Sequence, residues 1–179
     1  MADTNPARAI AVTKRIEMMC DFMEKPAIRT AVEQAVPVTM PRAPGALGFD
    51  IPLWVGLGLT GFWAALNAFS ERAGLSSPNC TICGRSSCIW AQFAPYAQNN
   101  NEKASLEELE DLRHLYAHNY AGEADDEYFA RKRHVLNRGA ITLTCGAQFA
   151  SGRVYLDLQH LRMYAKIVQR ILQRAGTVP

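Results

Sequence analysis

Apolar residues recur along most of this chain at the three- and four-residue spacing that places them on one face of a helix. The pattern predicts helices over residues 6–25, 27–36, 52–73, 105–119 and 158–174. Pro26 and Pro37 mark breaks, because proline removes a helical hydrogen bond. The predicted fold class is therefore all-α, and residues 1–179 are expected to form a single domain with a full core.

Two stretches interrupt the helical pattern. Residues 141–145 and 153–158 have a strand-like composition and flank a glycine-containing run, residues 146–152. They predict a small β-hairpin with an extended turn before the last helix. Residues 75–88 combine glycine with cysteine and are expected to form a loop.

The start of the fourth predicted helix carries a local capping signal. Ser105 is expected to be its N-cap, and Glu108, three residues later, completes a capping box. The apolar face of this helix holds Leu109, Leu112 and Tyr116. We therefore expect the helix to dock on the core through that face.

The third predicted helix contains the longest apolar run of the chain, residues 51–69. This length approaches the roughly 20 residues that span a bilayer. Pro52, Asn67 and several glycines interrupt the run, and no basic cluster directly flanks it. We expect a buried central helix, with a membrane span as the alternative. Its aromatic residues are expected in the core, with a ligand pocket as the alternative: Trp54, Phe62, Trp63 and Phe69.

The composition is that of a globular protein, with 49% hydrophobic residues and a net charge of +2. A charge this small does not by itself indicate nucleic-acid binding, so attraction to RNA would need a local basic patch. The candidates are residues 131–134 with Arg138, and Arg162, Lys166, Arg170 and Arg174; a solvated face is the alternative. The polar N-terminus and the odd number of cysteines favour a cytoplasmic protein without a signal peptide.

Cys80, Cys83 and Cys88 form the first candidate site for a ligand. A Cys-x2-Cys pair followed by glycine suits a structural zinc ion. A fourth ligand is missing locally, and Cys145, Cys20 or a histidine could supply it. A disulfide and plain thiols are the alternatives. A second metal set, Asp111, His114 and His118, has helical spacing but lacks the glutamate of zinc proteases.

Arg113 and His118 form the second candidate site. An arginine can hold a phosphate with its fork of donors, and a histidine can transfer a proton near neutral pH. Five residues on an ideal helix turn the chain by about 500°, so the two side chains point about 140° apart. A shared site therefore requires a loosened helix, a long reach by the arginine, or a second subunit. A surface arginine and a helix-end histidine are the alternative.

The spacing Arg113-x4-His118, with the polar His114 directly after the arginine, resembles the signature of the HEPN domain superfamily. The resemblance implies a helical bundle, a homodimer and a metal-independent endoribonuclease that needs no cofactor. His118 would take the proton of the ribose 2'-hydroxyl, Arg113 would neutralise the phosphate, and His114 or Asn119 would orient it. Tyr120 resembles the tyrosine of HEPN toxins that an antitoxin partner modifies with AMP.

Two other functions remain open on the sequence. A non-catalytic HEPN-like dimerisation or ligand-binding module would not need Arg113 and His118 in one accessible cleft. A zinc-stapled structural protein would bring Cys80, Cys83 and Cys88 together with a fourth ligand. No membrane partner is expected.

Overall fold

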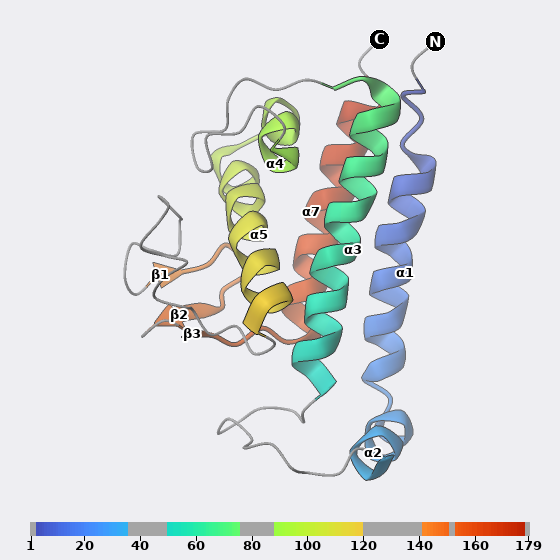
Figure 1. The fold of residues 1–179 in the computed structure, drawn as a ribbon, viewed down its shortest axis with the longest axis vertical. Helices are drawn as coiled ribbons and strands as arrows, with labels where there is room; N and C mark the ends of the chain where they lie inside the picture. Colours follow the sequence, from blue (N-terminus) through green and yellow to red (C-terminus); the bar gives the residue numbers. More distant parts are fainter. Residues whose placement is uncertain (1–2, 36–49, 76–87, 120–140, 151–152, 178–179) are drawn as a thin grey trace.

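The computed structural model describes residues 3–35, 50–75, 88–119, 141–150 and 153–177. These residues are mostly helical, as the apolar periodicity predicts. Long helices lie side by side: α1 (Ala7–Met23), α3 (Asp50–Ala73), α5 (Asn100–Asn119) and α7 (Leu158–Ala175) (Figure 1). Three shorter helices complete the helical part of the described chain: α2 (Pro26–Ala35), α4 (Ile89–Phe93) and the 3-10 helix η1 (Ala94–Tyr96).

Helix α3 contacts the three other long helices, α1, α5 and α7. Its fully buried side chains are Val55, Leu59, Phe62, Leu66 and Phe69. The helix expected to be buried is buried along one face and exposed along another, where Leu57 is 51% exposed. In the described ranges no helix is long and apolar enough to span a membrane. Trp54 and Trp63 lie at the edge of the core, because both remain partly exposed. Gly74 ends the helix with a φ of 66°, a conformation that favours glycine.

Helix α5 begins five residues before the predicted N-cap at Ser105, which corrects the capping prediction. Asn99 Oδ1 accepts a hydrogen bond from the Glu102 backbone N–H at 2.9 Å. The Glu102 carboxylate in turn accepts from the Gln98 backbone N–H at 2.8 Å. Asn99 therefore caps the helix, while Ser105 lies buried inside it.

We expect Asn99→Ala to lower the free energy of unfolding by about 1 kcal/mol, because the first turn of α5 loses its side-chain acceptor. The matched control is Asn100→Ala, since Asn100 is exposed and is the next residue along the chain. Urea denaturation of both variants measures the difference. Equal stabilities would show that Asn99 is not the cap.

The predicted hairpin is a three-stranded antiparallel sheet in the order β1 (Ile141–Thr142), β2 (Gln148–Ala150), β3 (Arg153–Val154). Residues 148–150, expected in an extended turn, are its middle strand. These residues are free to form a strand because the turn before them is short: the Gly146 N–H donates to the Leu143 carbonyl at 2.8 Å. Gly146 has a φ of 88°, so the chain reverses directly after Cys145.

Two polar side chains of α5 attach the sheet and its flanking residues Thr144 and Leu156, together called the sheet segment, to the helix. Glu108 accepts hydrogen bonds from both the backbone N–H and the hydroxyl of Thr144. At the other end, the Tyr116 hydroxyl accepts from the Leu156 N–H at 3.0 Å and contacts the Val154 carbonyl at 3.4 Å. Glu108 and Tyr116 are both buried. The helix face predicted to dock on the core therefore also holds the sheet.

Candidate functional site

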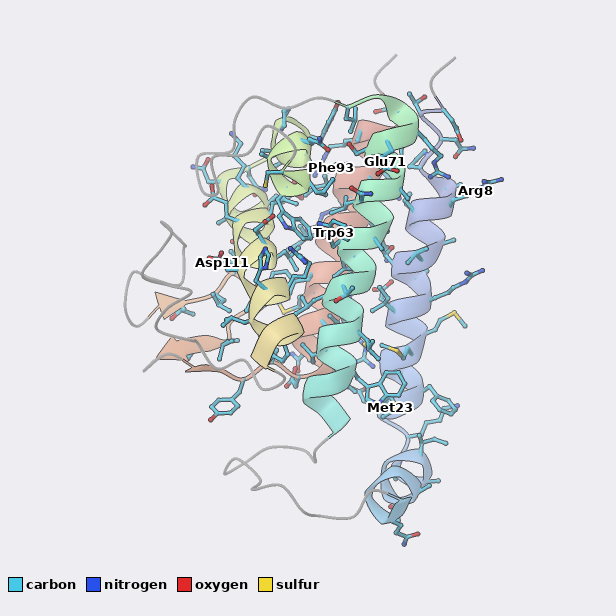
Figure 2. The ribbon with its side chains drawn as sticks, viewed as in Figure 1. Arg8, Met23, Trp63, Glu71, Phe93 and Asp111 are labelled. Carbon is cyan, nitrogen blue, oxygen red and sulfur yellow. The ribbon has the colours of Figure 1, made fainter. Side chains whose placement is uncertain are left out.

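Arg113 lies on the side of α5 that faces α3. Its guanidinium carbon stands 5.3 Å from the centre of the Trp63 ring, within the range of a cation–π interaction. Trp63 of α3 and Asp111 of α5 mark the two helices in Figure 2. The arginine is half-buried, so its charge is partly shielded from water but still reachable. A tryptophan under the guanidinium limits the directions in which its donors point.

The imidazole of His114 meets the guanidinium of Arg113. Arg113 Nη2 is 2.7 Å from His114 Nε2. Successive residues of a helix point about 100° apart, so the long arginine stem must bend along the helix to make this contact. The His114 side chain is 23% exposed, whereas Nε of Arg113 is buried.

The Glu110 carboxylate contacts the same imidazole from one turn earlier on α5. Its Oε1 is 3.5 Å from His114 Nε2, at the i, i+4 spacing that brings side chains together on a helix. Trp63, Glu110, Arg113 and His114 are called the Arg113 site below. Sequence reasoning missed Glu110, although its four-residue spacing from His114 was a usable signal.

The two contacts of His114 Nε2 require different protonation states. An arginine only donates hydrogen bonds, so Nε2 accepts from Arg113 when it carries no proton. A protonated Nε2 instead donates to the Glu110 carboxylate. Nε2 therefore has a partner whether or not it carries the ring proton, and the tautomer decides which of the two contacts forms.

Cys88, the last residue before α4, completes the surroundings of Glu110. Its Sγ donates to Glu110 Oε2 at 3.4 Å. Burial raises the pKa of Glu110, but hydrogen bonds from His114 and Cys88 and the charges of His114 and Arg113 outweigh it and hold the pKa below the ordinary value. Glu110 is therefore ionised at neutral pH.

The structure places the other predicted site residues only in part. His118 and Asn119 belong to the last turn of α5, and their side chains lie outside the described part of the chain. Tyr120, Cys80 and Cys83 lie outside the described residues altogether. Helix α5 continues through Asn119, so the loosening of the helix before that point does not occur.

The metal predictions find no assembled site in the described ranges, where no group of three or more histidine, cysteine or acidic side chains is arranged to hold an ion. Cys20, Cys88 and Cys145 are buried thiols. Cys20 lies on α1, where burial raises its pKa to about 11. Cys145 contacts Tyr164 on α7, and burial raises its pKa as well.

The basic residues of α7 are largely engaged in ion pairs and do not form an open patch. Arg162 binds Asp21 of α1 and Glu24, the residue after α1, at 2.7 and 2.6 Å. Arg170 and Arg174 both bind the buried carboxylate of Glu102 on α5. These pairs fix α7 against its neighbours. The other candidate patch, residues 131–134 with Arg138, lies outside the described residues.

Comparison with known protein families, with curated proteins and with solved structures gave no match for this chain. The function is therefore argued from the geometry and chemistry of the Arg113 site.

Proposed function

We propose that this protein is a metal-independent endoribonuclease whose substrate phosphate binds at the Arg113 site. One observation carries the proposal: the guanidinium of Arg113 rests on Trp63 and points one donor at the imidazole of His114. A permanent cation and an imidazole thus meet at one partly exposed place. The HEPN resemblance of Arg113-x4-His118 supports the same activity.

The proposed reaction uses the 2'-hydroxyl of the RNA as its nucleophile. His118 takes the proton of that hydroxyl, and the 2'-oxygen attacks the neighbouring phosphorus. Arg113 neutralises the charge that develops on the phosphate oxygens, with His114 or Asn119 orienting the group and Tyr120 contacting it. The products are a 2',3'-cyclic phosphate and a 5'-hydroxyl end.

The proposed assembly is a homodimer with α5 near the twofold axis. His118 lies five positions after Arg113, and α5 is helical at both positions. A second copy of the helix would place His118 of one subunit against Arg113 of the other. The proposal extends to a toxin or RNA-defence role with an antitoxin or regulatory partner, and to a structural zinc ion at Cys80, Cys83 and Cys88.

The second candidate is a non-catalytic helical interaction module. The same contacts favour it, since Trp63 and His114 hold Arg113 within the bundle without any ligand. Accessibility separates the two functions, because a purely structural arginine needs no exposed imidazole beside it.

Cleavage of mixed RNA in EDTA tests the proposal. We expect the purified protein to cut RNA, to leave 2',3'-cyclic phosphate ends and to leave DNA of the same sequence intact, because the nucleophile is the 2'-hydroxyl. His118→Ala should reduce the rate by roughly two orders of magnitude. Intact RNA, or equal cleavage of DNA, would leave the interaction module as the function.

A further inference from the structure

Two arginines of α1 differ from those of α7 in having no acidic partner. Arg8 and Arg15 are exposed, and neither forms an ion pair with a described residue. Seven helical residues turn the chain by about 700°, so the two arginines lie on one side of α1, about 10 Å apart along its axis. Figure 2 shows the Arg8 side chain extending away from the bundle. The two guanidinium groups are therefore available to an anionic ligand.

The acidic residues of α1 lie on its other side. Glu17 follows Arg15 by two residues, which turns the helix by about 200°. Glu17 Oε2 accepts a hydrogen bond from Gln169 of α7 at 2.6 Å, and Asp21 binds Arg162 of the same helix. Opposite charges thus occupy opposite sides of α1, and the side with the arginines attracts anions.

Phe22 continues the line of the two arginines. It follows Arg15 by seven residues and is 49% exposed. Lys25 Nζ stands 5.7 Å from the centre of its ring. An exposed aromatic ring beside cations is what a single nucleic-acid strand requires, because a base stacks on the ring while the cations neutralise phosphates. Arg8, Arg15, Phe22 and Lys25 are called the α1 surface below.

We infer that the α1 surface binds the single-stranded part of the RNA substrate beyond the cut, an inference that rests on the proposed endoribonuclease function. Arg8 and Arg15 contact backbone phosphates, and Phe22 stacks on an unpaired base. A lipid surface is the other anionic ligand to consider. A helix that lies in a bilayer interface inserts its apolar face there, whereas the apolar face of α1 is buried in the core through Ile16 and Met23.

Helix α3 separates the α1 surface from the Arg113 site, because it contacts both α1 and α5 (Figure 1). No acidic residue lies between Asp50 and Glu71, so most of α3 does not repel a phosphate backbone. Neighbouring helix axes lie about 8–10 Å apart, so a strand held at Arg113 reaches Arg15 after crossing about 20 Å. The exposed residues along that side of α3 recur at helical spacing and are uncharged: Leu57, Thr60, Ala64 and Ala68.

Substrate length separates the α1 surface from the catalytic residues. For a single-stranded RNA of about 20 nucleotides, we expect the double variant Arg8→Ala, Arg15→Ala to raise KM about 10-fold or more and to leave kcat within about a factor of two. Both constants for a dinucleotide should be unchanged, because a dinucleotide does not reach α1. The slope of log KM against log salt concentration should fall by about 0.7 for each arginine removed. Lys166→Ala, an exposed change on α7, is the matched control and should behave as wild type.

Phe22→Ala tests the stacking role in a binding experiment. Fluorescence anisotropy of a labelled 2'-O-methyl RNA measures affinity without cleavage, because this RNA lacks the nucleophile. Phe22→Ala should weaken binding of the single strand by roughly 5-fold to 100-fold, the range for loss of one stacked base, and Phe22→Trp should retain it. A duplex of the same sequence should bind wild type and Phe22→Ala equally, because its paired bases offer no free face. Circular dichroism establishes that each variant is folded.

The outcomes separate the α1 surface from the proposed function. An unchanged KM of the double arginine variant on the long RNA would overturn the phosphate contacts, and equal losses of Phe22→Ala on single strand and duplex would overturn the stacking. Binding to phosphatidylglycerol vesicles that requires Arg8 and Arg15, without binding of the 2'-O-methyl RNA, would assign the surface to lipid instead. Wild-type protein that binds the 2'-O-methyl RNA through α1 and cleaves no RNA would overturn the endoribonuclease function and leave the α1 surface as an RNA-binding site.

Discussion

Arg113→Ala should reduce RNA cleavage by about 100-fold or more, because removal of one preorganised group that stabilises transition-state charge has this size of effect. The guanidinium is held from two sides, by the Trp63 ring and by His114 Nε2. Its donors are therefore oriented before substrate binds. Initial rates on a fluorescent RNA, compared with Lys103→Ala on the same helix, measure the loss.

Arg113→Lys sharpens this test. Lysine retains the positive charge but lacks the planar fork that pairs with a phosphate and stacks on an aromatic ring. We expect it to recover only a small part of the lost rate. A lysine variant as active as wild type would show that charge alone is needed, and full activity of Arg113→Ala would contradict the proposed site.

The helical part of the fold could be predicted because apolar periodicity reports burial directly. The helix predicted over residues 158–174 is α7, and four side chains on one of its faces are fully buried: Leu161, Ala165, Val168 and Leu172. The start of α5 could not be predicted correctly from Ser105 and Glu108. Both residues matched a local capping pattern. In the structure, however, each binds Thr144, which lies 39 positions after Ser105 and 36 positions after Glu108.

The candidate site was predictable only in its local part. The sequence pointed to Arg113 and His114, but helical angles do not predict a contact between neighbouring residues, because it depends on the bending of the arginine stem. Cys88 reaches Glu110 from 22 residues away, and Trp63 reaches Arg113 from another helix. Such contacts follow from the packing of α3, α4 and α5, which periodicity does not determine.

Glu108→Ala should lower the free energy of unfolding by about 2–4 kcal/mol. The buried carboxylate accepts hydrogen bonds from the Thr144 backbone and hydroxyl and from the Tyr164 hydroxyl. Removal leaves the buried Tyr164 hydroxyl and the partly buried donors of Thr144 without this acceptor, at about 1–3 kcal/mol for a fully buried group, while loss of the buried charge offsets part of the cost. Urea denaturation measures the difference, with Glu107→Ala, the less buried neighbour on α5, as the matched control.

The loss caused by Glu108→Ala should also depend on pH in a defined direction. Burial raises the pKa of Glu108 above the ordinary glutamate value, although hydrogen bonds from Thr144 and Tyr164 oppose the shift. A carboxyl group with a raised pKa in the folded state stabilises the protein fully below its unfolded pKa, and this contribution declines as pH rises through the folded value. The stability difference between wild type and Glu108→Ala should therefore be larger at about pH 4 than at about pH 7. A difference that grows with pH would show that hydrogen bonding outweighs burial, and that the sheet segment is held by a stably ionised carboxylate.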